Sequence, residues 1–377
     1  MRDLIPAYLI TQTPDLKKIV FTVTNDLNYD QRMIRICTSL AAAGYDVLLT
    51  GVQRKGSTPL SQRPYRQKRL ECIFQTGIGF YAEYNTRLFF FLLFQKADIL
   101  CCIDLDTMLP VWLAARMRNK MPVYDAHEYF SQQKEVISRP GVYRVWHWIE
   151  SSLVPGFRHG YTVCQSIADE FSRLYKVNYE VIRNVPVLKD IDRQVQPAGR
   201  LILYQGAVNE ARGLEFLIPA MKQVDARLEI YGDGNFMEQT KMIIAKNNLQ
   251  AKVLLKGKRL PEYLDDITRR AHIGLNLVEN NGLNQYYSLA NKFFDYIHTG
   301  IPQLTMNYPE YKRINDVFEV AILIDDLKED TIAEALNKLL TDEVLYQRLK
   351  QNCLKAREVL NWQEEEKKLI SFYNRLS

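Results

Sequence analysis

The chain has 377 residues, of which 47% are hydrophobic and 25% charged, and its net charge at pH 7 is +5. This length favours two domains that each bury a core, and this composition excludes an intrinsically disordered chain. The net charge is too small to indicate nucleic-acid binding. The charge is nevertheless uneven, because six basic residues and no acidic one fall between Val52 and Leu70.

The six cysteines lie mostly in apolar runs, where a free thiol behaves as a small hydrophobic side chain. No two of them have the spacing of zinc ligands, so we expect reduced thiols and a cytoplasmic protein. Residues 1–18 lack an apolar core of signal-peptide length, and the longest apolar run, Leu88–Phe94, is too short to cross a bilayer. We therefore expect a soluble protein, or one that lies on the inner face of the cell membrane.

Strand-like and helical segments alternate along the first half, which is typical of parallel α/β architecture. The predicted strands are Lys18–Thr24, Asp46–Gly51, Arg69–Phe74, Asp98–Ile103, Pro122–Ala126, Gly160–Cys164 and Tyr179–Ile182, and the helices between them include Asp30–Ala43, Thr107–Arg118 and Ser166–Tyr175. The segment from Pro186 to Gly199 is polar, contains proline and has no periodicity. It is predicted to be a linker.

The alternation restarts after this linker. The predicted strands are Arg200–Gly206, Ala226–Gly232, Lys252–Gly257, His272–Val278, Pro302–Thr305 and Val320–Ile324, and the last part of the chain is helical and charged. We therefore predict two Rossmann-like α/β domains with parallel sheets, residues 1–186 and 200–377, joined by a linker at 187–199; whether the last helix returns to the first domain is left open. Because ligands of open parallel sheets bind at the carboxyl ends of strands, we expect the site in a cleft between the domains.

Three strand ends of the second half carry glycine or basic residues. The first continues as GAVNEARG at 206–213, where glycine lets the backbone approach a ligand, the following helix start attracts an anion, and Arg212 supplies a cation suited to phosphate. The second is GDG at 232–234, and the third is KGKR at 256–259, which includes Lys258. Each of the three also fits an ordinary turn or a solvated loop.

The fourth strand end is more informative. After the strand His272–Val278 and a polar loop, Ser288 stands where a helix N-cap is expected, which would place Asn291, Lys292 and Asp295 in the first two turns. The N–H groups of a helix start and Lys292 would hold a diphosphate, and Asp295 would accept hydrogen bonds from ribose hydroxyls. The alternative is an amphipathic surface helix on which Lys292 and Asp295 form an ion pair.

The segment SLANKFFDYIHTGIPQL at 288–304 resembles the SLPNKLFEYMAAGKPV pattern of glycosyltransferase family 4, whose members are retaining enzymes of the GT-B fold. Other segments resemble this family in the same order: NYDQRMIRICTSLAAAGYDVLL, VYDAHEYF, LILYQGAVNEARGLEFLIPAM, LEIYGDG and VLLKGKRLPEYL. The resemblance covers about residues 18–310, and the SLxNK pattern indicates a divergent subfamily. It implies a GT-B fold in which the first domain binds the acceptor and the second binds a nucleotide-sugar donor.

The same resemblance implies roles for individual residues. His127 matches the active-site histidine that lies beside the donor sugar, and Gly206 and Arg212 match residues that contact the donor diphosphate. The loop and helix start that bind the same phosphates correspond to Ser288, Leu289, Ala290, Asn291 and Lys292, and the basic loop adds Lys258 as a further donor-binding residue. Asp295 matches the second glutamate of the E-x7-E motif, which binds the nucleotide ribose.

Several positions depart from the family pattern. The first glutamate of E-x7-E would fall at Tyr287, and Asp295 is one bond shorter than the usual glutamate. Ala207 replaces an arginine that is often found there, and Asn25-Asp26-Leu27-Asn28 replaces a glycine-rich loop after the first strand. These departures leave the donor open between UDP-linked and GDP-linked sugars.

The resemblance implies transfer with retention of anomeric configuration, without a metal or another cofactor, to a saccharide or lipid-linked acceptor in surface polysaccharide or glycoconjugate synthesis. The diphosphate leaving group would be stabilised by Arg212, Lys292 and the helix start near Ser288. One alternative is a sugar-nucleotide epimerase of similar fold. Another is a non-catalytic nucleotide-sugar-binding protein, which the missing carboxylate at Tyr287 favours.

The basic stretch Val52–Leu70 is followed by Tyr81, Tyr84, Arg87 and the run Leu88–Phe94. Basic residues beside aromatic and aliphatic ones suit an anionic membrane surface, so residues 52–94 are a candidate for peripheral membrane contact. The alternative is that Leu88–Phe94 belongs to a core helix between two strands.

Overall fold

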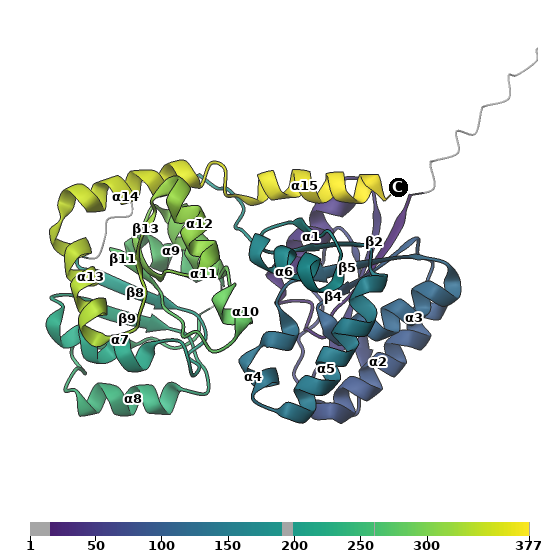
Figure 1. Ribbon diagram of the computed structural model, residues 1–377, viewed down its shortest axis with the longest axis horizontal. Helices are drawn as coiled ribbons and strands as arrows, with labels where there is room; N and C mark the ends of the chain where they lie inside the picture. The colour runs from purple at the N-terminus through teal and green to yellow at the C-terminus, as the bar shows by residue number, and fades with distance from the viewer. Residues whose placement is uncertain (1–15, 191–198, 260, 377) are drawn as a thin grey trace, which may run out of the picture. The chain divides into compact units, whose positions relative to one another are not determined.

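The computed structural model of the chain describes residues 16–190, 199–259 and 261–376. Its elements form two parallel sheets, each accompanied by helices (Figure 1). Most of the predicted linker falls on residues 191–198, and most of the N-terminal stretch tested for a signal peptide falls on residues 1–15; both lie outside the described residues. By its internal contacts the chain divides into two compact units: one runs up to Tyr124 and includes the chain end from Phe372, and the other covers Asp125–Ser371.

The first sheet has seven strands in the order β3-β2-β1-β4-β5-β6-β7. They are β1 (Lys18–Thr22), β2 (Asp46–Gln53), β3 (Arg66–Glu71), β4 (Ile99–Ile103), β5 (Met121–Ala126), β6 (His159–Thr162) and β7 (Glu180–Val181). Strand β1 pairs in parallel with β2 on one side and β4 on the other. Both β1 and β4 are apolar and almost wholly buried, as expected for central strands that are covered on both faces.

The three helices predicted with bounds in this part of the chain begin and end within one residue of the predicted positions. They are α1 (Gln31–Ala42), α2 (Gly77–Phe94), α3 (Met108–Arg118), α4 (Lys134–Ile137), α5 (Pro140–Leu153) and α6 (Gln165–Tyr175). Asp30 stands at the N-cap of α1, and its carboxylate accepts a hydrogen bond from the backbone N–H of Met33. This is the usual reason that aspartate starts a helix.

Helix α2 is buried on one side only. It packs against α3 and buries Phe80, Tyr84, Leu88 and Leu92, which are spaced four residues apart. Phe90 and Phe94 of the same helix are exposed. The run Leu88–Phe94 is therefore partly a core helix, as one interpretation predicted, and partly an apolar surface.

The second sheet has six strands in the order β10-β9-β8-β11-β12-β13. They are β8 (Leu201–Gln205), β9 (Arg227–Tyr231), β10 (Val253–Leu255), β11 (Ile273–Asn276), β12 (Gln303–Met306) and β13 (Ala321–Ile324). Every residue of β8 and β11 is buried, and the two strands lie side by side with Ile273 opposite Ile202. The strand order reverses between them, and ligands of open parallel sheets bind at such a point.

Two groups of helices accompany this sheet. The helices are α7 (Leu214–Ala220), α8 (Met237–Lys246), α9 (Pro261–Arg270), α10 (Leu283–Tyr286), α11 (Asn291–Thr299), α12 (Pro309–Phe318), α13 (Glu329–Thr341), α14 (Glu343–Ala356) and α15 (Trp362–Arg375). Helix α7 packs against α8 and α13, whereas α11 packs against β11, α9 and α14. These contacts place the start of α11 beside the carboxyl end of β11.

Helix α15 belongs to the second unit at its start and to the first unit at its end. At its start, the Glu365 carboxylate accepts a hydrogen bond of 2.9 Å from the backbone N–H of Arg183. At its end, the ring of Tyr373 meets the ring of Phe21 edge-on at 6.0 Å, and Asn374 accepts a hydrogen bond of 2.7 Å from the hydroxyl of Tyr45. Each unit therefore contains packed side chains from this one helix.

Every predicted strand is present, and β3 differs most from its predicted position. The prediction Arg69–Phe74 followed the apolar residues, whereas the strand is Arg66–Glu71. It ends at Glu71 because the backbone N–H groups of Ile73 and Phe74 donate to the carboxylate of Glu83 instead of to a neighbouring strand.

The six cysteines are all free thiols, and five of them are buried. Within the described ranges, no helix combines the length and the apolar character that a membrane span requires.

Candidate donor-binding site

The loops after β8 and β9 touch one another at a pair of glycines. The backbone N–H of Gly206 donates to the carbonyl of Tyr231 at 3.0 Å, and Gly206 has a positive φ of 133°. A Cβ atom at Gly232 would lie only 1.8 Å from the carbonyl oxygen of Gly206. The close approach of the two loops therefore requires glycine at position 232. Gly206 itself is exposed.

Arg212 lies at the end of the loop that follows β8. Its neighbours Ala211 and Gly213 both have positive φ angles, 64° and 70°, so the chain turns sharply before α7 begins. The carbonyl of Ala211 accepts a hydrogen bond of 3.0 Å from the backbone N–H of Glu279, which ties this loop to the end of β11. Arg212 is half-buried, and its guanidinium has no hydrogen bond or ion pair with the residues that the structure describes. It is thus a permanent cation without a carboxylate partner among these residues.

Lys292 is the second such cation, and it lies in the first turn of α11. Its Nζ atom is 4.3 Å from the centre of the Tyr204 ring, and Tyr204 is fully buried in β8. No carboxylate in the described part of the chain pairs with this ammonium. Burial, with a smaller contribution from the charge of Arg212, lowers the pKa of Lys292 to about 7. A negatively charged ligand would favour the charged ammonium and so oppose the effects of burial and of Arg212 on this pKa.

The ion pair between Lys292 and Asp295, which belonged to the alternative interpretation of this helix, is not formed. Lys292 faces the ring of Tyr204, whereas Asp295 accepts a hydrogen bond of 3.0 Å from the side-chain amide of Gln205. The hydroxyl of Thr268 in turn donates to the Gln205 carbonyl oxygen at 2.8 Å, which fixes the orientation of the amide. Asp295 is therefore held at the end of β8, one helical turn beyond Lys292.

The prediction that Ser288 caps this helix is wrong. Helix α11 begins at Asn291 with Ala290 at its N-cap, and no side chain caps it. Ser288 instead lies 3.2 Å, hydroxyl to hydroxyl, from Tyr311 of α12, and its backbone N–H donates to the carbonyl of Gln285. Ser288 is thus occupied by the preceding short helix and by α12, and the start of α11 keeps N–H groups that no side chain satisfies.

The residues between Ser288 and Lys292 have three different environments. The side chain of Leu289 is buried, and the backbone N–H of Ala290 donates to the hydroxyl of Tyr311 at 3.1 Å. Asn291 is exposed, and its side-chain oxygen accepts a hydrogen bond of 2.9 Å from the amide of Asn184. Leu289 therefore anchors the loop in the core, whereas Ala290 and Asn291 make polar contacts with Tyr311 and Asn184.

Lys258 is not joined to this set. It follows β10, is exposed, and makes no hydrogen bond or ion pair with any residue that the structure describes. The loop that carries it is linked to the site only through the backbone, because the N–H of Gly232 donates to the carbonyl of Gly257 at 3.1 Å. Its place among the donor-binding residues stays a prediction.

His127 directly follows β5 and is half-buried, with its backbone N–H donating to the carbonyl of Asp125 at 3.1 Å. The next residue, Glu128, accepts a hydrogen bond of 3.4 Å from the side-chain amide of Asn284. The carbonyl oxygen of the same Asn284 side chain accepts a hydrogen bond of 2.9 Å from the backbone N–H of Tyr129. Since Asn284 lies in α10, just before Ser288, the segment after His127 and the segment before α11 are joined directly.

Two carboxyl groups near Arg212 were not identified from the sequence. Glu215 lies in the first turn of α7, and Glu279 follows β11. Burial, together with the adjacent Glu279 carboxyl, raises the pKa of Glu215. Its Oε2 atom is buried without a hydrogen-bond partner among the described residues, so a proton shared with Glu279 would satisfy it. The strand-end position of Glu279 was visible in the sequence, but its proximity to Glu215 was not.

No group of three or more His, Cys, Asp or Glu side chains that could hold a metal ion occurs within the described ranges. The charged groups available at this site are the two cations and the neighbouring carboxyls of Glu215, Glu279 and Asp295. This arrangement suits a ligand that combines a strongly anionic group with hydroxyl groups.

Residues 189–356 match the family model for glycosyl transferases group 1. This segment is a glycosyltransferase group 1 domain. The match covers the second sheet, Arg212 and Lys292, and the chain that carries it is a glycosyltransferase. A search of curated proteins gives no match to the sequence.

Solved structures resemble this glycosyltransferase over nearly its whole length. Sucrose-phosphate synthase from Thermosynechococcus elongatus has 15% sequence identity and a TM-score of 0.78, covering 96% of this chain and 99% of its own. HepE from Anabaena, in complex with UDP-glucose, has 11% identity and a TM-score of 0.76, covering 95% and 99%. WaaG, a glycosyltransferase involved in lipopolysaccharide biosynthesis, has 16% identity and a TM-score of 0.71, covering 93% and 98%. The likeness confirms the predicted GT-B fold.

Proposed function

We propose that the chain transfers a sugar from a UDP- or GDP-linked donor to a saccharide or lipid-linked acceptor, with retention of anomeric configuration, in the synthesis of a surface polysaccharide or glycoconjugate. The observation that carries this proposal is the pair of cations Arg212 and Lys292, which have no carboxylate partner among the described residues. Lys292 lies at the start of α11, which no side chain caps, and Arg212 lies in the loop just before α7. A diphosphate is the ligand whose charge and oxygen geometry best match that arrangement. The UDP-glucose in the HepE structure is consistent with such a donor.

These contacts support the following position for the donor. The diphosphate lies against Arg212, Lys292 and the N–H groups at the start of α11, where the helix dipole adds to the attraction. Asp295 accepts hydrogen bonds from the ribose hydroxyls, because it lies one turn further along α11 and is oriented by Gln205. Burial of the Lys292 ammonium strengthens its interaction with a phosphate oxygen, since the local dielectric is lower than that of water.

The transfer step needs little covalent chemistry from the protein. The acceptor hydroxyl oxygen forms a bond to the anomeric carbon on the face from which the diphosphate departs, and the bond from that carbon to the phosphate oxygen breaks. The proton of the hydroxyl goes to the departing phosphate oxygen, whose negative charge Arg212 and Lys292 stabilise. His127 positions the donor sugar beside the reacting carbon. Binding the leaving group more strongly than the intact donor is how this site would accelerate transfer.

The test is incubation of the full chain with a panel of UDP- and GDP-linked sugars, with and without candidate acceptors. We expect slow release of free nucleotide from one donor alone, faster release with an acceptor, and a product whose anomeric proton keeps the donor configuration in an NMR spectrum. Conversion of the sugar while it remains on the nucleotide would instead identify an epimerase. Tight binding without any turnover would identify a non-catalytic binding protein. Lys292→Met is the matched control, because it removes the cation and keeps an apolar stem of similar length.

A further inference from the structure

Three large apolar side chains protrude from the short segment between β3 and α2. Ile73, Phe74 and Ile78 are 78%, 56% and 85% exposed. They lie after the carboxyl end of β3 and at the start of α2, and are called the apolar tip below. Exposing three such side chains within six residues costs free energy unless a partner covers them.

The backbone of the apolar tip is held in place from inside. The carboxylate of Glu83 accepts hydrogen bonds of 2.9–3.0 Å from the N–H groups of Ile73 and Phe74, and Arg87 forms an ion pair of 2.8 Å with Glu83. The Phe74 ring packs over Gly79, where an added Cβ would lie 3.2 Å from the ring. The backbone N–H groups of Ile73 and Phe74 are therefore hydrogen-bonded within the protein. Moving the tip into an apolar medium would leave neither of them unpaired.

Basic residues lie beside the apolar tip. Lys55 donates its backbone N–H to the side-chain oxygen of Gln75 at 3.2 Å, and the Arg54 guanidinium lies 4.0 Å from the centre of the Phe80 ring. These contacts fix the loop after β2 against the loop that carries the tip. The Lys55 ammonium is exposed and pairs with no described carboxylate.

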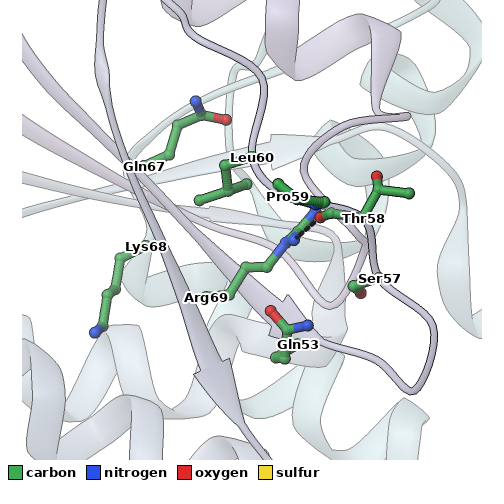
Figure 2. Close-up of a pocket in the computed structure, with 8 residues that line it drawn as sticks. All are labelled: Gln53, Ser57, Thr58, Pro59, Leu60, Gln67, Lys68 and Arg69. Carbon is green, nitrogen blue, oxygen red and sulfur yellow. Dashed lines mark hydrogen bonds between the residues drawn. The ribbon is translucent and has the colours of Figure 1, made fainter.

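Lys68 is a second exposed cation, and it lies on β3, the strand that leads into the tip. A pocket of about 460 Å³ is lined by Gln53, Ser57, Thr58, Pro59, Leu60, Gln67, Lys68 and Arg69. Within it Arg69 points toward Thr58, whose carbonyl accepts its hydrogen bond, whereas Lys68 points away (Figure 2). Arg69 is also neutralised by an ion pair with Asp26. Lys68 is exposed and has no partner in the described part of the chain.

We propose that the apolar tip inserts into the surface of an anionic phospholipid bilayer, with Lys55 and Lys68 over the headgroups. A narrow turn with three protruding apolar side chains is too small for a stable protein interface, which needs about 800 Å² on each partner. It suits shallow insertion among acyl chains, and the flanking lysines suit anionic headgroups. This inference is independent of the donor chemistry. Within the predicted membrane-contact region 52–94, it assigns the contact to residues 55–78.

The test is co-sedimentation of the full chain with vesicles of phosphatidylcholine, with and without phosphatidylglycerol. We expect binding to the mixed vesicles that the triple variant Ile73→Ser, Phe74→Ser, Ile78→Ser weakens about 100-fold, because about 1 kcal/mol is lost for each of the three side chains. Lys55→Glu and Lys68→Glu should each weaken it about 5-fold or more on mixed vesicles, and leave binding to pure phosphatidylcholine nearly unchanged.

The matched control is Phe94→Ser, which removes a side chain that is 83% exposed at the opposite end of α2. It should bind mixed vesicles like the original chain. The inference is overturned if the original chain binds neither kind of vesicle, if the triple variant binds equally well, or if Phe94→Ser causes the same loss. All variants change exposed side chains, and an unaltered thermal midpoint will establish that they are folded.

Discussion

The ammonium of Lys292 lies 4.3 Å from the centre of the Tyr204 ring, and it is this ring, not a carboxylate, that faces the charge. The face of an aromatic ring attracts a cation without neutralising it. The tyrosine hydroxyl points elsewhere, donating to the carbonyl of Ala207 at 2.7 Å. Tyr204 therefore positions Lys292 within a desolvated site and leaves its charge available to an anionic ligand.

The first prediction concerns proton uptake on donor binding. Burial lowers the pKa of Lys292 to about 7 in the unliganded protein, so at pH 8 most molecules carry a neutral amine. A diphosphate favours the charged form and raises this pKa again. We expect UDP or GDP to bind with uptake of nearly one proton at pH 8, and its affinity to fall by up to about tenfold per pH unit above 7. Calorimetry in buffers of different ionisation enthalpy measures the uptake.

The second prediction is that Lys292→Met stabilises the unliganded protein while it weakens nucleotide binding. The pKa of Lys292 is lower in the folded protein than in the unfolded chain, so between pH 7 and 10.5 the unfolded chain binds more protons. Lys292 therefore lowers the free energy of unfolding most when the pH is below about 7, where its buried amine is charged. Removing the unpaired cation should raise the free energy of unfolding at pH 6 by about 1 kcal/mol. Urea denaturation at pH 6 and pH 9 tests this, and a larger gain at pH 9 would contradict it.

The positions of most strands were predictable because most of them combine a short apolar run with polar turn residues. In β8 and β11 every residue is buried, so the sequence signal is continuous. The edge strand β3 was misplaced because its sequence, RQKRLE, has little apolar character and because β2 is its one neighbour among the described strands. Its end is determined by the distant carboxylate of Glu83, which no local pattern reveals.

The positions of the candidate site residues were predictable where they depend on one element alone. Lys292 and Asp295 fall on the first turns of α11 as expected. The cap assigned to Ser288 failed because its hydroxyl meets Tyr311, which lies 23 residues further along the chain. The partners of Asp295 and Glu215 were also invisible, since Gln205 and Glu279 approach them only when the strands come together.

The third prediction separates ribose binding from phosphate binding. Asp295→Asn keeps the size of the side chain but removes the charged acceptor, so the affinity for UDP or GDP should fall about 10- to 100-fold, as for loss of a charged hydrogen bond. The affinity for inorganic pyrophosphate should not change. Competition binding measures both values. An equal loss for pyrophosphate would mean that Asp295 acts on the phosphate site and not on the ribose.

The fourth prediction concerns the close approach of the loops after β8 and β9. A Cβ atom at Gly232 would lie 1.8 Å from the carbonyl oxygen of Gly206, so Gly232→Ala must push the loops apart. We expect a loss of about 2–4 kcal/mol in the free energy of unfolding and weaker nucleotide binding. Gly141→Ala is the control, because an added Cβ there meets nothing within 4 Å. Equal stability of the two variants, measured by urea denaturation, would show that the loops adapt without cost.

The last prediction assigns His127 to the transfer step. If His127 positions the donor sugar beside the reacting carbon, His127→Ala should lower kcat about 100-fold and leave the affinity for free UDP or GDP within about twofold. The reason is that the proposed nucleotide contacts come from α11 and the loop after β8, whereas His127 follows β5. His147→Ala is the matched control, because His147 is exposed on α5 and stacks on Tyr143. Full activity of His127→Ala with normal donor binding would exclude the assignment, and a loss confined to nucleotide affinity would move His127 to the donor phosphates.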